Sequence, residues 1–178
     1  MRYQLVLPLT ATLACTPALA TQYLTADQAQ KLMFPDATAF RPQELALTLP
    51  QMQQVEKLAG LAARSVNWRV VAAYRDETLL GYMVLDEVIG KFELISYAVG
   101  LNPDATVRQV EILVYRESHG GEVRLPAWRR QFAGKSVTGG GLAVADGIAC
   151  ISGATLSCTH ITDGVRRIAA IASVALRK

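Results

Sequence analysis

A run of small and hydroxylated residues, Ser152-Gly153-Ala154-Thr155, stands directly before a segment with helical periodicity. The N–H groups in the first turn of a helix lack partners within the helix, and the helix dipole adds partial positive charge at the same end. This position therefore suits an anion, and phosphate is the obvious candidate. The alternative is an ordinary helix start in which Ser152 or Thr155 is the capping residue.

Two cysteines, Cys150 and Cys158, flank this run, and a third, Cys15, lies near the start of the chain. An eight-residue separation around a turn could bring Cys150 and Cys158 together as a disulfide, which needs Cα atoms about 5.5 Å apart and an oxidising compartment. Two small, partly buried thiols are the alternative. The spacing leaves both open.

The chain has two histidines, His119 and His160, which are far apart in the sequence and have no Cys-x-x-Cys beside them. No metal site is predicted. Ser157 stands three residues before His160, but no third residue that would orient the histidine is evident, so a hydrolase triad is not expected. His119 is either a hydrogen-bond donor to a ligand or an exposed loop residue.

The elements that position these residues follow from capping signals and periodicity. Thr25 and Thr48 each precede a glutamine by three residues, as in a capping box, and predict two helices, the first ending at about Met33. From residue 68 to residue 115 the apolar period changes from 3.6 to 2, which predicts four strands over residues 68–75, 79–85, 92–99 and 107–115. Residues 126–132 predict a short helix.

A long C-terminal helix is predicted from the residues that repeat at helical spacing after Thr155. Gly164 lies on its apolar face, where a glycine costs about 1 kcal/mol against alanine, so we expect a neighbouring element to approach closely there. The fold class is therefore α+β: a central, mainly antiparallel sheet of about four strands, with N-terminal helices and a long C-terminal helix. Residues 21–66 are expected to form a helical N-terminal lead.

Residues 1–20 have the features of a secretory signal peptide: Arg2, an apolar stretch, and Ala18-Leu19-Ala20 before a cleavage site. Cleavage near Ala20 removes one positive charge and lowers the net charge of the 178-residue chain from +3 to +2. A lipid anchor at Cys15 is the alternative. No later run approaches the ~20 apolar residues of a membrane helix. The charge is too small to favour nucleic acid as a partner.

The segment Ser152-Gly153-Ala154-Thr155-Leu156-Ser157 resembles the flavinylation motif of the FMN-binding domain family, which includes components of the sodium-translocating NADH:quinone reductase and of a related electron-transport complex. In that family the threonine is esterified to the FMN phosphate, which implies covalent FMN at Thr155. The loop Glu117-Ser118-His119-Gly120 resembles the family's Glu-Thr-Pro-Gly loop beside the flavin. The resemblance covers residues 68–178, and we expect the FMN-binding domain to span residues 67–178.

The resemblance implies a set of cofactor-binding residues. They are Ser152, Gly153, Ala154, Thr155, Leu156, Ser157, Glu117, Ser118, His119, Gly120 and Trp128. Candidate walls for the isoalloxazine ring are Trp128, Tyr82, Tyr97 and Leu156, and candidate cations near it are Lys91, Arg124 and Lys135. One position departs from the family pattern, because Ala149 stands where an aspartate is usual and the nearest acid is Asp146.

These features predict an exported electron-transfer protein that carries FMN, matured by a flavin transferase and serving a membrane or periplasmic redox partner. Nothing in the sequence suggests a nicotinamide site, so a carrier is favoured over a stand-alone oxidoreductase. The alternative is an exported ligand-binding or sensing module of the same fold, which binds FMN non-covalently or not at all. The departure at Ala149 is the observation that favours this alternative.

Overall fold

The computed structural model describes residues 20–177, so the predicted signal peptide lies outside the described residues except for Ala20. In chain order, the elements of the N-terminal half are β1 (Thr21–Gln22), α1 (Ala26–Met33), β2 (Ala39–Ala46), α2 (Leu49–Ala59), β3 (Asn67–Arg75), β4 (Thr78–Ile89), β5 (Leu94–Leu101) and β6 (Val107–Tyr115). The 3-10 turn η1 (Gly121–Arg124), α3 (Pro126–Arg129), the 3-10 turn η2 (Arg130–Phe132), β7 (Ala143–Val144), β8 (Gly147–Ile148) and α4 (Thr155–Ala175) follow.

The main sheet has six strands in the order β1-β6-β5-β4-β3-β2, and all neighbouring strands in it are antiparallel. The α+β class and the antiparallel sheet are therefore confirmed, but the expected number of about four strands was too low. Both added strands lie at sheet edges. β2 carries Pro42 and mostly exposed side chains, as an edge strand tolerates, so its sequence lacks the alternation that marks a strand with one buried face.

The expected helical lead, residues 21–66, therefore contains two strands of the main sheet as well as two helices. The helices themselves begin where they were predicted. Thr25 accepts a hydrogen bond from the Gln28 amide and Gln28 caps in return, and Thr48 and Gln51 repeat this reciprocal arrangement. The capping boxes could be predicted because each involves residues only three positions apart. The pairing of β2 with β3 could not, because it joins residues that are far apart along the chain.

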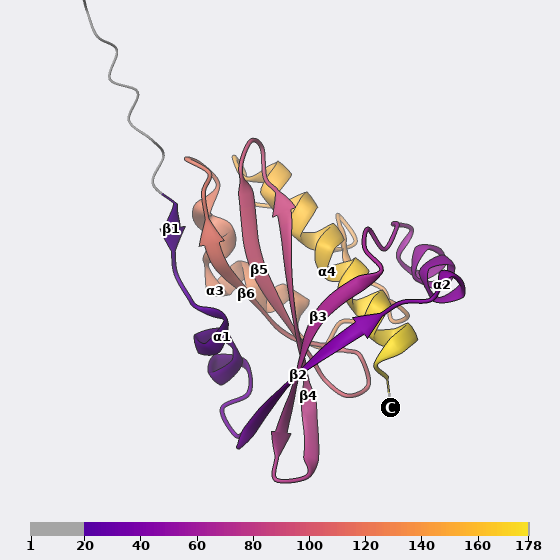
Figure 1. Cartoon of the computed structure of the whole chain (residues 1–178). Helices are drawn as coiled ribbons and strands as arrows, with labels where there is room; N and C mark the ends of the chain where they lie inside the picture. Colours follow the sequence, from indigo (N-terminus) through magenta and orange to yellow (C-terminus); the bar gives the residue numbers. More distant parts are fainter. Residues whose placement is uncertain (1–19, 178) are drawn as a thin grey trace, which may run out of the picture.

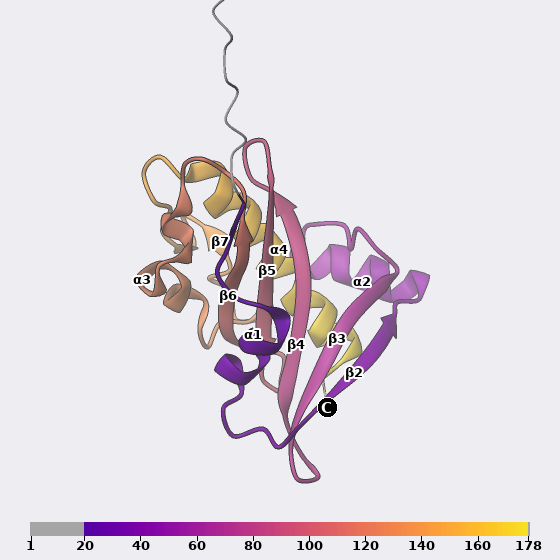
Figure 2. The same ribbon diagram turned by 60° about the vertical axis from the view of Figure 1, so that its left-hand side comes forward.

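Helices cover both faces of the sheet (Figures 1 and 2). The long α4 lies against one face together with α2, and its buried residues form the larger core with inward-facing residues of β3 to β6. The short α1 covers part of the other face, where Met33 and Phe34 pack against Met83, Ala98 and Leu113. No helix among residues 20–177 is long and apolar enough to cross a membrane.

At Gly164, α4 lies close against the sheet. A Cβ atom built on Gly164 would lie 1.9 Å from the Tyr97 hydroxyl oxygen, so the glycine leaves the space that this hydroxyl occupies. Tyr97 is fully buried, and its hydroxyl donates to Asp86 Oδ2 at 2.6 Å. Burial first, and then the neighbouring Asp86 carboxylate, raise the pKa of Tyr97 well above its usual value. The close approach expected from Gly164 is confirmed.

We predict that Gly164→Ala lowers the free energy of unfolding by about 1–3 kcal/mol, because the added methyl overpacks the contact with Tyr97. Chemical denaturation measures this. Ser173→Ala, at a half-buried position of the same helix, is the matched control and should change stability by no more than about 0.5 kcal/mol. A Gly164→Ala protein as stable as the parent would contradict the packing argument, since helix propensity alone favours alanine.

Candidate functional site

The first turn of α4 has no side-chain cap. Its N-cap residue is Ala154, and neither Ser152 nor Thr155 accepts a hydrogen bond there, so the ordinary capping alternative is wrong. The amide of Cys158 bonds to the Ala154 carbonyl at 2.9 Å. The three amides before it, those of residues 155–157, make no hydrogen bond to any acceptor within residues 20–177. The turn therefore offers unpaired donors at the positive end of a 21-residue helix.

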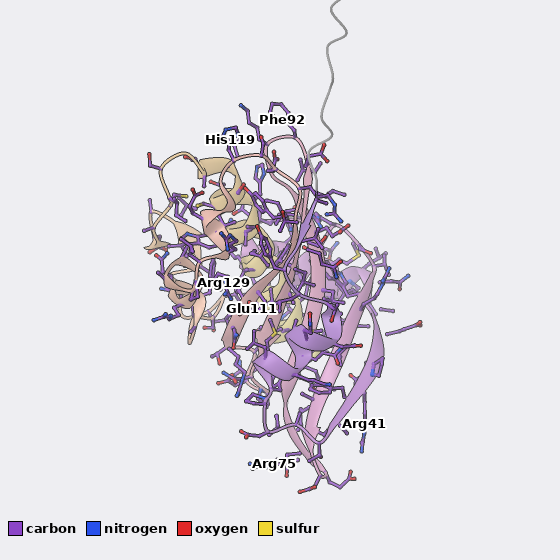
Figure 3. The ribbon with its side chains drawn as sticks, turned by 90° about the vertical axis from the view of Figure 1, so that its left-hand side faces the viewer. Arg41, Arg75, Phe92, Glu111, His119 and Arg129 are labelled. Carbon is purple, nitrogen blue, oxygen red and sulfur yellow. The ribbon has the colours of Figure 1, made fainter. Side chains whose placement is uncertain are left out.

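These amides open onto a cleft of about 440 Å³ that three separate segments enclose. The first is the tip of the β4–β5 hairpin, with Lys91 and Phe92. The second is the loop after β6, with Glu117, Ser118 and His119, and the third is the start of α4, residues 153–157. Figure 3 shows Phe92 and His119 at the same end of the molecule. Three segments that lie far apart along the chain therefore form one cleft.

Glu117 joins the hairpin tip to the loop after β6. Its Oε1 atom accepts hydrogen bonds from three successive backbone amides, those of Lys91, Phe92 (2.6 Å) and Glu93 (2.9 Å). Burial by itself would raise the pKa of Glu117, but these three amides and the charge of Lys91 outweigh it, and the pKa lies below the usual value. The glutamate is therefore held ionised and fixes one wall of the cleft.

Tyr115 joins the same loop to α4. Its hydroxyl donates to the His119 carbonyl at 2.6 Å and lies 3.2 Å from the Oγ atom of Ser157, a buried residue in the first turn of the helix. Gly120 makes this junction possible: a Cβ atom there would lie 2.9 Å from the Tyr115 hydroxyl and 3.2 Å from the Ala154 Cβ, and φ is +81°. The loop and the helix start are thus tied together beneath the cleft.

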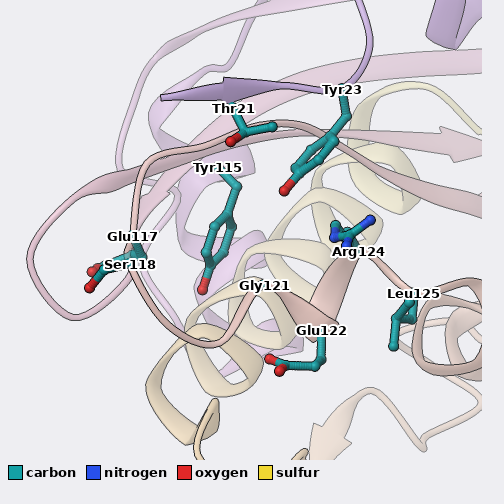
Figure 4. Close-up of a pocket in the computed structure, with 9 residues that line it drawn as sticks. All are labelled: Thr21, Tyr23, Tyr115, Glu117, Ser118, Gly121, Glu122, Arg124 and Leu125. Carbon is teal, nitrogen blue, oxygen red and sulfur yellow. The ribbon is translucent and has the colours of Figure 1, made fainter. Parts of the chain in front are cut away.

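A second cleft of about 310 Å³ adjoins the first and shares Glu117 and Ser118 with it. Figure 4 shows the rings of Tyr23 and Tyr115 in this second cleft, with Arg124 beside Tyr23. The Arg124 guanidinium lies 5.2 Å from the centre of the Tyr23 ring. Tyr23 follows β1, so the N-terminal edge strand also contributes to this end of the molecule.

The cleft gathers most of the predicted cofactor residues but not all of them. Gly153, Ala154, Thr155, Leu156, Ser157, Glu117, Ser118 and His119 line it, whereas Ser152 and Gly120 do not. Trp128 is not among the lining residues either. It is buried against Phe132 at 5.1 Å between ring centres, and its indole N–H donates to the Ala149 carbonyl at 2.8 Å.

Of the other residues proposed as ring walls or as cations near the ring, some line a cleft and others lie elsewhere. Tyr82 and Tyr97 are buried in the core beneath α4, and Leu156 lines the cleft. Lys91 lines the cleft as well, Arg124 lines the adjoining one, and the Lys135 ammonium lies close to Gly141 and Gly147. Asp146 is exposed in the turn between β7 and β8 and does not line the cleft.

Phe92 is a cleft residue that the sequence pattern did not single out as a ligand contact. It is 76% exposed, the highest exposure among the large apolar residues of the described chain. Its signal in the sequence was an aromatic side chain within a polar strand connection, Gly90-Lys91-Phe92-Glu93. The Lys91 ammonium lies 4.8 Å from the centre of its ring. Phe92 thus offers an aromatic face that packs on no core residue.

Cys150 lies just before α4, and Cys158 and His160 lie within its first two turns. Cys150 and Cys158, for which the sequence left a disulfide and two thiols open, are free thiols in the structure. His160 donates a ring N–H to the Ile89 carbonyl, and Ser157 lies against Tyr115, so these two residues make no catalytic pair. Within residues 20–177, no group of three or more His, Cys, Asp or Glu side chains is placed to hold a metal ion.

The cleft lies within a region that is similar to a known domain family. Residues 90–170 match the family model of the FMN-binding domain. The matched region contains the whole hairpin tip, the loop after β6 and the start of α4, which are the three segments of the cleft. It begins later than the resemblance drawn from residue 68. No curated protein matches the chain.

We predict that Glu117→Gln destabilises the protein at neutral pH and that the loss shrinks in acid. Because the pKa of Glu117 is lowered in the folded chain, its ionised form stabilises the fold above the ordinary value of 4.5, and this contribution disappears as the pH falls through the lower folded-state pKa. Denaturant unfolding of both proteins between pH 3 and 7 measures the difference. Glu122→Gln, exposed in the same region, should show no such trend. A loss that stays constant with pH would contradict the assignment.

Proposed function

From the FMN-binding domain matched at residues 90–170, we propose that this protein carries one FMN in the cleft at the start of α4. The FMN phosphate is esterified to Thr155, and the protein, exported after cleavage near Ala20, passes electrons to or from a membrane or periplasmic partner. The observation that carries the proposal is the uncapped first turn of α4, which presents an exposed threonine and three unpaired amides to a cleft.

The helix start fits the phosphate end of FMN. A phosphoester on Thr155 bears negative charge, and unpaired amides at a helix N-terminus stabilise an anion through hydrogen bonds and the helix dipole. Thr155 is exposed, so a flavin transferase could reach its hydroxyl. Ala154, the N-cap residue, has no side-chain acceptor that would compete with phosphate for these amides. The lack of a cap is therefore an advantage for an anion site.

The rest of the cleft fits the flavin ring. Phe92 and Leu156 supply apolar surface. His119 Nδ1 lies 2.9 Å from Ser118 Oγ, which leaves Nε2 to hydrogen-bond a polar edge of the ring. Lys91 supplies a positive charge that favours added negative charge nearby. When bound, FMN supplies one- and two-electron transfer. The protein's own residues would hold the group, shield its ring and adjust the local charge.

A carrier explains these features better than a stand-alone enzyme. The sequence suggests no nicotinamide site, and the cleft is enclosed by residues that hold or shield a ligand. Phe92 and Leu156 are 76% and 46% exposed at the cleft, which suits an electron-transfer partner that approaches the ring directly. The signal-like residues 1–20 support export, and a flavin transferase in the same compartment would complete maturation.

We predict that Thr155→Ala abolishes covalent flavin. Co-expression with a flavin transferase should give the parent chain a fluorescent band on a denaturing gel and a mass gain of one FMN less one water. Thr159→Ala is the matched control, because Thr159 lies one turn further along α4, is partly buried and makes no side-chain hydrogen bond within residues 20–177. It should keep the band.

Two outcomes would contradict covalent carriage at Thr155. In the first, the parent chain shows no band although the transferase labels a known acceptor. In the second, Thr155→Ala keeps the band. A yellow native protein that loses its colour on denaturation would support the alternative of non-covalent FMN, which the departure at Ala149 favours.

We predict that Phe92→Ala weakens FMN binding by the Thr155→Ala protein about five- to tenfold, because an aromatic contact contributes about 1–1.5 kcal/mol. Quenching of flavin fluorescence on titration measures the dissociation constant. Ile89→Ala is the matched control, since Ile89 is 61% exposed on the same hairpin but does not line the cleft. Equal effects of the two substitutions would contradict a role for Phe92 in the site.

A further inference from the structure

Cys150 and Cys158 lie on either side of the loop that carries Thr155. Each thiol contacts a backbone atom of a residue in this loop. Cys150 is partly exposed before the loop, and Cys158 is fully buried in the first turns of α4. The Ile151 amide donates to Cys158 Sγ at 3.3 Å, and the Cys150 thiol points to the Thr155 carbonyl oxygen at 4.0 Å. Cys150 is also one of the groups that raise the pKa of Cys158.

These contacts place the sulfur atoms within reach of a disulfide. The Ile151 nitrogen is one peptide unit from the Cys150 Cα, about 2.4 Å away by standard backbone geometry. Since Cys158 Sγ lies 3.3 Å from that nitrogen, it is at most about 5.7 Å from the Cys150 Cα. A rotation of the Cys150 side chain and a small shift of the loop are enough to bring the two sulfurs to bonding distance.

We propose that Cys150 and Cys158 form a redox-active pair, and that their disulfide locks the loop of residues 151–157 and so restricts access of a flavin transferase to Thr155. The structure is that of the dithiol form. The second part rests on the proposed function, whereas the first concerns the two cysteines alone. The pair therefore sets an order of events, with flavin attachment before oxidation.

The reaction is a thiol–disulfide exchange with a disulfide oxidant, such as a thiol oxidase of the exported compartment or oxidised glutathione. The partly exposed Cys150 thiolate attacks the oxidant, whose S–S bond breaks and leaves a mixed disulfide. The Cys158 thiolate then attacks Cys150 Sγ, the new S–S bond forms, and the second oxidant sulfur leaves as a thiol. The two cysteines lose two electrons and two protons, and the oxidant gains them.

We expect the second step to limit the rate, because the attacking Cys158 thiol is fully buried. Burial, together with the adjacent Cys150, raises the pKa of the Cys158 thiol to about 11. Only a small fraction of Cys158 is thiolate at neutral pH, and this fraction rises about tenfold per pH unit below the pKa. Besides Cys150, the titratable group coupled to this thiol is Tyr115, whose raised pKa has the charge of Cys158 among its causes. The Ile151 amide also donates to the Cys158 sulfur and opposes the rise in the Cys158 pKa.

The disulfide changes the loop in two ways that bear on Thr155. It removes the Cys150 thiol proton that points to the Thr155 carbonyl. It also closes a short covalent ring around the loop, which reduces the number of open conformations that the loop can sample. A transferase must bring the Thr155 hydroxyl into its own active site, so a loop that opens less often is modified more slowly.

The first experiment tests the disulfide without flavin. The exported chain, or the full chain with Cys15→Ser, is exposed to a glutathione redox series, quenched with acid, denatured and alkylated. We expect the oxidised chain to lose both alkylation sites and the mass of two hydrogen atoms, and closure to accelerate about tenfold per pH unit between pH 7 and 9. Cys150→Ser, which keeps only Cys158, should form no intramolecular disulfide. If both thiols are alkylated at every ratio of reduced to oxidised glutathione, the proposed disulfide does not form and the proposal is wrong.

The second experiment compares flavin attachment to the reduced and the oxidised chain with the same transferase and FMN donor. We expect the oxidised chain to be modified about tenfold more slowly, equal to about 1.4 kcal/mol of added opening free energy. Cys150→Ser should be modified at one rate under both conditions, which controls for oxidation of the transferase. Equal rates for the reduced and the oxidised parent would contradict the proposal that the disulfide restricts access of the transferase to Thr155.

The two experiments separate this inference from the proposed function. If the bridge forms but Thr155 is not modified in either state, the proposed covalent carriage fails and the redox pair stands. If Thr155 is modified but no bridge forms at any poise, the pair fails and the proposed function stands.

Discussion

The depth at which α4 lies on the sheet is the constraint on which the candidate site depends. Gly164 lets the Tyr97 hydroxyl fit against the helix, and that hydroxyl is in turn fixed by Asp86. The Asp86 carboxylate also accepts from the partly exposed Arg64 at 2.7 Å, so the hydroxyl on which Gly164 packs is held in place by two successive polar contacts. Thr155 lies nine residues away, about 14 Å along the helix axis. A contact in the middle of α4 thus fixes where its first turn meets the sheet edge.

A second set of polar contacts shapes the cleft around that turn. Glu117 gathers the three amides of the hairpin tip, and Tyr115 links the loop after β6 to the start of α4. Buried polar groups that are fully paired specify one arrangement, because losing a partner leaves an unpaired group at a cost of about 1–3 kcal/mol. The amides at the start of α4 are the exception, and unpaired donors beside a cleft are what an anion requires.

The contrast between Trp128 and Phe92 shows how a site residue is distinguished from a core residue. Trp128 follows a loop that resembles a flavin loop, yet it is buried and uses its indole N–H to fix the Ala149 carbonyl. Its role here is to position the segment before the cysteines. Phe92 carries no motif, but its strand connection projects it from the sheet into the cleft. Burial, which decides between the two roles, depends on how the elements pack.

The sequence by itself determined the features that rest on neighbours in the chain. The capping boxes at Thr25 and Thr48 and the alternation in β3 to β6 could be predicted, because each depends on residues a few positions apart. The run of small and hydroxylated residues before α4 could also be recognised, but the sequence left open whether Ser152 or Thr155 caps the helix, and only the structure shows that neither does. The tertiary structure alone decided the edge strand β2, the exclusion of Trp128 from the cleft and the meeting of residues 91–92, 117–119 and 153–157. Edge pairing and cleft formation depend on contacts between distant segments, for which no local pattern exists.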